Sequence, residues 1–161
     1  MDTELAILCE FLEMIDQKLN SINELISNSI DPDSDGLCDR GEYFIGIGFV
    51  AIQQYLVESL IATGVSKGDA YRLGPIHSSE QSIISIINDC ANYWKHEAEW
   101  VGVAGLHKQG LKTYSQVTDV ADTDWYKLSN VLFSLCDGNK FSFNSLIPYI
   151  RDWQVCIHEN R

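Results

Sequence analysis

Apolar residues near the start of the chain recur every three or four positions, which is the spacing of one face of an α-helix. The positions that share this spacing are Leu5, Leu8, Leu12, Ile15, Leu19, Ile22 and Ile26. Many positions between them are acidic, so the pattern predicts an amphipathic helix that turns an acidic face toward solvent. Asp2 or Thr3 is placed to cap its first turn.

A second segment, residues 42–63, is apolar on nearly every side. A helix of this composition belongs at the centre of a bundle, because no face of it is suited to water. Gly46 and Gly48 each lower its helix propensity by up to about 1 kcal/mol. This cost is most simply offset if another backbone packs closely at the two glycines.

The middle of the chain shows one more helical pattern and one irregular stretch. Ser66 begins a capping-box sequence for a short helical turn. A longer helix is expected from near Ser78 or Ser79 to about Trp100. The following stretch, residues 101–117, contains three glycines and no clean period. We expect an irregular loop there, with room for a short strand.

The last part of the chain predicts two further helices. Residues 122–124 are expected to open the first, with Trp125 facing inward and Gly138 ending it. Asn144 is expected to cap the second, after a brief extended piece. With no internal repeat and no linker, the pattern indicates an all-α single domain, residues 1–161, built as a bundle of about five helices.

The charge of the chain is both strong and uneven. The 161 residues include 11 Lys and Arg against 23 Asp and Glu, a net charge of −12. Residues 1–42 hold eleven of the acids with only Lys18 and Arg40, which leaves −9 in that segment. Nucleic acids and anionic membranes bind cationic side chains, so neither is expected as a direct partner. A basic protein or a cation fits better, and the alternative is acidity that serves solubility alone.

Cysteine usage and the N-terminus bear on location. The five cysteines are odd in number and include no C-x-x-C pair, which is typical of reduced thiols in apolar helix faces. The first residues lack the layout of a secretory signal. No stretch approaches the roughly 18 uncharged apolar residues of a membrane span. Together these features predict a cytoplasmic protein.

An aspartate-rich segment lies between the first two predicted helices. From Asp31 to Glu42 it fits the pattern D-x-D-x-D-G followed by five residues and Glu. It resembles an EF-hand loop, in which alternate carboxylates, a carbonyl and a final bidentate carboxylate surround a calcium ion. The resemblance implies calcium as the cofactor. The implied ligands are Asp31, Asp33, Asp35, Leu37 through its carbonyl, Asp39 through water, and Glu42.

The same segment also fits an explanation without a cation. In that case it is a solvated acidic turn in a protein that has no cofactor. Asp39 is then the N-cap of the second helix and Glu42 its capping-box partner.

Asn88, Asn92 and His96 recur at every fourth position and share one face of the third predicted helix. The run Ala91-Asn-Tyr-Trp-Lys-His96 resembles the motif of HEPN domains, helical bundles of which many are ribonucleases. The resemblance implies a catalytic site in which His96 transfers a proton beside Asn92. Ala91 stands where that family has a phosphate-binding arginine. The alternative is a HEPN-like bundle without catalysis, with a structural histidine hydrogen-bonded to a neighbouring helix.

In overall character, a small acidic domain without a further catalytic motif resembles the bacterial immunity proteins, which neutralise cationic nuclease toxins. The resemblance implies a non-catalytic protein whose partner is a basic protein of this kind. An acidic surface speeds such an association and mimics the phosphates of the nuclease substrate. The expected contact residues are Glu10, Glu13, Asp16, Asp33, Asp35 and Asp39. Calcium binding and HEPN-like ribonuclease activity are the alternatives.

Overall fold

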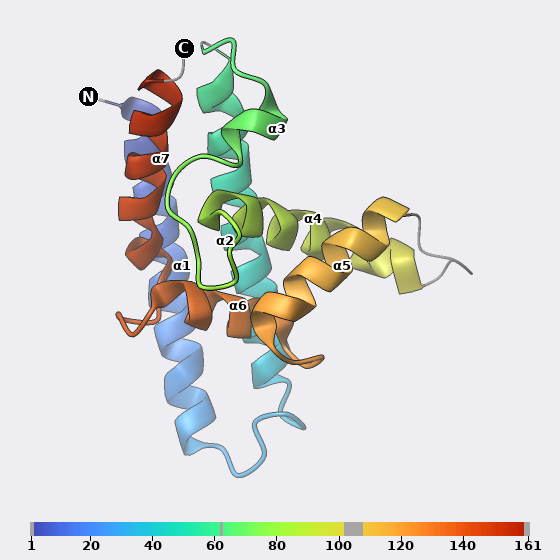
Figure 1. The fold of residues 1–161 in the computed structure, drawn as a ribbon. Coiled ribbons are helices and arrows are strands. Elements are labelled where there is room, and N and C mark those ends of the chain that lie inside the picture. Colours follow the sequence, from blue (N-terminus) through green and yellow to red (C-terminus); the bar gives the residue numbers. More distant parts are fainter. Residues whose placement is uncertain (1, 62, 102–107, 160–161) are drawn as a thin grey trace.

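The structure is a computed structural model that describes residues 2–61, 63–101 and 108–159 (Figure 1). Within these ranges the chain forms seven α-helices and one 3₁₀-helix, η1. They are α1 Thr3–Asn28, α2 Leu37–Leu60, α3 Lys67–Ala70, α4 Ile83–Val101, α5 Lys108–Ala121, α6 Lys127–Cys136, η1 Phe143–Leu146 and α7 Ile147–Glu159. The predicted all-α class is confirmed, and the described part of the chain has more helices than the five expected.

Helix α1 forms where the apolar spacing predicts it. Its seam from Leu5 to Ile22 is buried, and the carboxylate of Asp2 accepts a hydrogen bond from the Leu5 N–H at 2.9 Å. Asp2 is therefore the N-cap, because it satisfies one of the free N–H groups of the first turn.

Helix α2 lies at the centre of the bundle. It contacts α1, α4 and α6, and Figure 1 shows α1 and α2 side by side over most of their lengths. Phe49, Ile52 and Leu56 are fully buried. Among the described helices, α2 is the one long and apolar enough to cross a membrane, a composition that a central bundle helix shares. The prediction of a central helix is confirmed, although α2 begins at Leu37 and ends at Leu60.

Two glycines of α2 allow aromatic rings to lie against its backbone. A Cβ added at Gly46 would lie 1.9 Å from Cδ1 of Trp94, and one at Gly48 would lie 2.4 Å from the ring of Phe143. The expected close approach of another backbone is wrong: the neighbours at both glycines are aromatic side chains. Gly46 thereby fixes the position of the Trp94 indole, which matters for the site described below.

The prediction of an irregular loop at residues 101–117 is wrong over most of its length, because Lys108–Ala121 forms α5. Residues 102–107 lie outside the described part of the chain. The buried positions of α5 include Gly110, Thr113 and Val117, which have helical spacing. Two of these three are not hydrophobic residues, so the helical period could not be recognised from apolar positions alone.

Two expectations for the C-terminal part are also wrong. Trp125 is 76% exposed instead of facing inward, because α6 begins only at Lys127, after Tyr126 in a left-handed conformation with φ of 46°. Asn144 is not the cap of the last helix. Ser142 caps η1 through its side chain, and α7 continues directly from η1.

Candidate functional site

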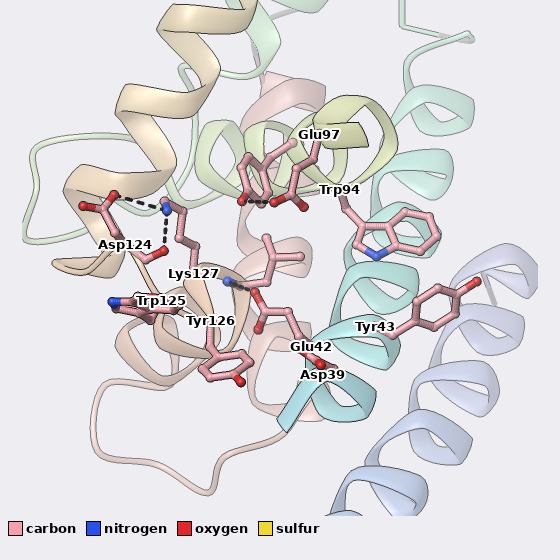
Figure 2. A pocket seen from close by; sticks show the side chains of 11 residues that line it. Asp39, Glu42, Tyr43, Trp94, Glu97, Asp124, Trp125, Tyr126 and Lys127 are labelled. Carbon is pink, nitrogen blue, oxygen red and sulfur yellow. Dashed lines mark hydrogen bonds and ion pairs between the residues drawn. The ribbon is translucent and has the colours of Figure 1, made fainter. Parts of the chain in front are cut away.

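A cavity of about 310 Å³ opens where the start of α2, the end of α4 and the segment before α6 meet. Four of its lining side chains are carboxylates, five are aromatic and one is a lysine. We call it the acidic pocket; its lining is Asp39, Glu42, Tyr43, Tyr93, Trp94, Glu97, Asp124, Trp125, Tyr126, Lys127 and Leu128 (Figure 2). The combination of negative charge and aromatic rings suits a cationic group.

One wall of the pocket is built on α2 and α4. The Trp94 indole lies against Gly46, where any larger residue would displace it. The ring of Tyr43 meets the indole edge to face, with centroids 5.4 Å apart and planes at 75°. This arrangement is favourable for aromatic pairs, and it leaves Tyr43 exposed at the rim.

The opposite wall is the segment from Asp124 to Lys127, which Figure 2 shows across the pocket from Trp94. The ammonium group of Lys127 donates to the Asp124 carbonyl at 2.7 Å and lies 3.3 Å from the Asp124 carboxylate. It also lies 4.8 Å from the centre of the Tyr114 ring. The lysine that lines the pocket is therefore buried and already paired, so it does not oppose a second cation.

Tyr126 joins this wall to the aspartate-rich segment, because its hydroxyl donates a hydrogen bond to Asp33. The pKa of the Tyr126 phenol is raised, chiefly by that bond, which favours the protonated form. Asp33, Asp35 and Asp39 are all exposed. The pocket and the acids of the segment are thus parts of one surface.

Glu42 has a structural role at the floor of the pocket. Its carboxylate accepts hydrogen bonds from the N–H of Leu128 at 2.6 Å and from the N–H and hydroxyl of Ser129 at 2.9 and 2.6 Å. A carboxylate at a helix N-terminus satisfies free N–H groups and interacts favourably with the helix dipole. Glu42 therefore fastens α6 to α2, although it also lines the cavity.

Two other carboxylates keep free capacity. Asp39 is exposed and forms no hydrogen bond or ion pair within the described residues. Glu97 accepts a hydrogen bond from the Tyr93 hydroxyl at 2.7 Å through one oxygen only. Burial and this bond raise the pKa of Tyr93, so Tyr93 remains a donor. Asp39 and Glu97 are the carboxylates best placed to meet a ligand.

The predicted contact residues are not all on this surface. Glu10 and Glu13 are exposed on α1, where Glu13 accepts a hydrogen bond from Asn144. Asp16 is only 5% exposed, and its carboxylate accepts from the N–H groups of Phe143 at 2.7 Å and Asn144 at 3.1 Å. Burial raises the pKa of Asp16. Including Asp16 among the contact residues is therefore wrong: it closes the N-terminus of η1.

Several of the six predicted calcium ligands make other contacts in the structure. Asp31 accepts from the N–H and hydroxyl of Ser34, and Asp35 accepts from the Ser29 hydroxyl at 2.6 Å. Leu37, Asp39 and Glu42 lie within α2. In the described ranges no group of three or more His, Cys, Asp or Glu side chains is placed to hold a metal.

The cation-free explanation of this segment is wrong in its capping residue. The N-cap of α2 is Gly36, whose φ of 66° lies in the left-handed region, and it makes no side-chain cap. The N-cap thus lies three residues before Asp39, and Asp39 is already inside the first turn of α2. Glycine adopts this conformation without strain, which allows the sharp entry into α2.

The Asn88, Asn92 and His96 strip is divided between two environments. The Gln53 amide of α2 donates to the Asn88 and Asn92 side chains at 2.8 and 3.0 Å. His96 instead lies at the surface, 3.1 Å from Glu99 of its own helix, so the expected bond to a neighbouring helix is wrong. Ala91 stands where the HEPN motif has an arginine, and its uncharged side chain is buried.

Sequence reasoning missed Trp94, Glu97, Asp124 and Trp125 as pocket residues. One signal was present: an acidic and aromatic run, Asp122-Thr-Asp-Trp-Tyr126, in a stretch assigned to a helix start. Comparison with known proteins finds no matching family, no similar curated protein and no similar solved structure. The function must therefore be argued from the geometry of the pocket itself.

Proposed function

We propose that this chain is a non-catalytic immunity-type protein that binds and neutralises a basic protein, a nuclease-type toxin. The observation that carries the proposal is the acidic pocket with its free carboxylates, which adjoins the exposed acids of residues 31–39. The partner contributes cationic side chains, and the pocket surface contributes carboxylates and aromatic rings.

Exposed aromatic residues support a protein partner. Trp125 is 76% and Tyr43 is 58% exposed, and both line the pocket. Trp and Tyr are enriched among residues that dominate binding energies at protein interfaces, because they bury much area with little loss of conformational entropy. Acids serving only solubility would not need exposed rings beside them.

The charge supports a basic partner whose own ligand is anionic. With a net charge of −12, the chain attracts a basic protein over long range and raises the association rate. A nuclease holds phosphates with Lys and Arg, and a carboxylate surface competes for the same side chains. Binding therefore occludes the site that the toxin needs.

The geometry gives the ribonuclease alternative less support. Asn92 is held by Gln53 between α2 and α4, whereas His96 pairs with Glu99 at the surface. General acid and base catalysis requires its groups to reach the same reacting atoms. These two residues make separate contacts, and both lie outside the lining of the pocket.

Affinity capture tests the proposal. The tagged chain is exposed at low salt to a lysate of its own organism, and bound proteins are released with increasing salt. We expect a stoichiometric partner with an isoelectric point above about 9, whose nuclease activity the purified chain blocks. A captured partner that is acidic, or whose activity is unchanged by the chain, would contradict the proposal.

A further inference from the structure

We infer that a groove between α1 and α2 binds an amphipathic helix of the basic partner. The apolar face of that helix lies in the groove, and its Lys or Arg side chains lie at the end formed by Glu4 and Glu58. The groove measures about 290 Å³ and is lined only by residues of these two helices; we call it the apolar groove. The inference rests on the proposed function for the source of the helix, and it adds a second contact region to the acidic pocket.

The apolar groove follows the axes of two neighbouring helices. Leu8 and Phe11 line it from α1, and Ala51 and Tyr55 line it from α2. Figure 1 shows the two helices side by side and running in opposite directions. Helices pack into the grooves between neighbouring side chains at axis separations of about 8–10 Å, and recognition of a partner helix in an apolar groove uses the same geometry. The groove therefore has the form that suits a third helix.

The α1 side of the groove presents large apolar side chains to solvent. Ile7 is 62% and Met14 is 64% exposed, and the partly buried Phe11 lies between them. Their spacing of four and three residues places all three on one face of α1, beside the buried seam from Leu5 to Ile22. Contiguous exposed apolar residues with a polar rim are typical of interaction surfaces. This stripe offers anchor contacts along about two turns of a partner helix.

One end of the groove carries negative charge. Glu4 and Glu58 line both the groove and an adjoining cavity of about 570 Å³. The side chain of Glu4 forms no hydrogen bond or ion pair within the described residues, and Glu58 accepts from the Gln54 amide at 2.7 Å through one oxygen only. The described lining includes no Lys, Arg or His. This end is complementary to cationic side chains and to the positive N-terminus of a helix.

A second copy of this chain is a poorer occupant than a basic helix. Each copy carries a net charge of −12, so two copies repel one another. The stripe of α1 that the second copy would offer has the exposed acids Glu10 and Glu13 close by in the sequence. A helix with flanking Lys or Arg gains attraction at the same surface. Charge complementarity therefore favours the basic partner.

Helix α2 links the apolar groove to the acidic pocket. Tyr43 lines the pocket and Ala51 lines the groove, and eight residues of helix correspond to about 12 Å. A protein partner can span this distance and contact both regions. Charged groups chiefly set the rate of association, whereas close apolar contacts chiefly slow dissociation. The two regions should therefore affect different rate constants.

The first test uses a synthetic helical peptide of about 14 residues as the probe. It has two lysines at its N-terminus and leucines along one face, and binding is followed through the methyl NMR signals of Ile7 and Met14. We expect saturable shifts with a Kd of about 10–100 μM. Ile30 is the internal reference, because it is fully exposed and lies outside the groove.

Two altered peptides test the chemistry of the occupant. One has the same composition with its leucines distributed around the helix, and the other has glutamates in place of the lysines. Each should bind at least about tenfold more weakly, because the first has no continuous apolar face and the second meets Glu4 and Glu58 with like charge.

Variants of the chain test the surface. Ile7→Ser with Met14→Ser should weaken binding of the peptide by about tenfold, and Glu4→Gln with Glu58→Gln by about threefold to tenfold. Against the captured partner, the serine pair should raise the dissociation rate at least about fivefold and change the association rate by less than about twofold. Leu25→Ser is the control, since Leu25 is also exposed on α1 but outside the groove, and it should leave both rates unchanged.

Several results would overturn the inference: equal binding of the rearranged peptide, equal shifts at Ile30, or unchanged binding by the serine pair. Shifts of Ile7 and Met14 that depend on protein concentration without peptide would also overturn it, because a second copy then covers the groove. Failure of the peptide together with capture of a basic partner removes this inference and leaves the proposed function standing. Binding of the peptide without any basic partner removes the proposed function and leaves the groove as a helix-binding site.

Discussion

Asp39 and Glu42 lie one turn apart on α2 and both line the acidic pocket, yet their carboxylates have different roles. Glu42 is half-buried and accepts three hydrogen bonds at the N-terminus of α6. Asp39 is exposed and forms no hydrogen bond or ion pair within the described residues. The difference shows that acidity in a sequence mixes groups that hold the fold together with groups that remain available to a ligand.

The same division applies to the acidic first segment of the chain. Asp2 caps α1, Asp16 accepts from two N–H groups at the start of η1, and Glu42 accepts from two N–H groups at the start of α6. Part of the negative charge of residues 1–42 therefore stabilises helix N-termini. The remainder, together with Glu97 and Asp124 from later in the chain, forms the surface that we assign to binding.

The strongest test of the division removes one carboxylate of each kind. Glu42→Ala should lower the free energy of unfolding by about 2–4 kcal/mol, because it leaves charge-assisted hydrogen bonds at α6 unmade. Asp39→Ala should change it by less than about 0.5 kcal/mol, as expected for an exposed side chain without a partner. Urea unfolding at pH 7 measures both, and similar losses in the two variants would erase the distinction.

The pocket wall can be tested in the same way with two glycines. Gly46→Ala should destabilise the fold by about 1–3 kcal/mol, because its Cβ meets the Trp94 indole. Gly68→Ala is the control, since a Cβ there has no neighbour within 4 Å, and it should be neutral or stabilising by up to about 1 kcal/mol. Thermal unfolding compares them. A tolerated Gly46→Ala would mean that Trp94 is not fixed by that contact.

Asp89 shows what burial does to a carboxylate that caps no helix. Burial raises its pKa from 3.8 to about 6, and the hydrogen bond that it accepts from the Asn88 side-chain amide is long, at 3.4 Å. A raised pKa means that the folded state binds the proton more tightly, so this group reduces stability as the pH rises from about 4 to about 6. Above about pH 6 ionisation of Asp89 causes no further loss of folding stability.

Asp89→Asn should therefore be more stable than the wild type by about 1–2 kcal/mol at pH 7, with part of the gain offset by the buried amide. The difference should shrink toward zero at pH 4, where Asp89 is protonated in the folded protein. Unfolding curves at both pH values provide the measurement. A variant that is less stable than the wild type at pH 7 would indicate that the charge is better compensated than its contacts show.

Calcium is expected to have the smallest effect. Glu42 is bound at α6, and Asp31, Asp33 and Asp35 accept hydrogen bonds from Ser34, Tyr126 and Ser29, so titration calorimetry should give no saturable heat up to about 1 mM calcium. Saturable heat that disappears in Asp31→Asn would restore the calcium explanation of residues 31–42. It would also require Glu42 to leave the N-terminus of α6.

Much of the fold follows from local sequence patterns. The seam of α1 and the apolar character of α2 on all sides could be predicted, because each is a local pattern. The two glycines of α2 indicated a close approach, but not that aromatic side chains would make it. Helix α5 was missed because Gly110 and Thr113 occupy buried positions that hydrophobic spacing does not mark. The entry into α6 was misread because left-handed residues at Asp122 and Tyr126 are not signalled by residue type.

The candidate site was less predictable, for a physical reason. The pocket combines α2, α4 and the segment before α6, which only tertiary packing brings together. The acidic pattern of the sequence predicts Asp39 as a contact residue, but it predicts Asp16 equally, and Asp16 is buried. Whether a carboxylate faces solvent or a helix N-terminus depends on neighbours that are distant in the chain. The local spacing of residues gives no information about those neighbours.

The most direct measurement of the central claim compares two charge reversals of equal size against the captured basic partner. Asp39→Lys with Glu97→Lys alters the pocket, and Glu10→Lys with Glu13→Lys alters exposed acids of α1. Association rates are measured over a range of salt concentrations. We predict that the pocket pair slows association at least about tenfold and reduces its salt dependence, while the α1 pair changes the rate by less than about threefold. Equal effects of the two pairs would contradict a binding surface centred on the acidic pocket.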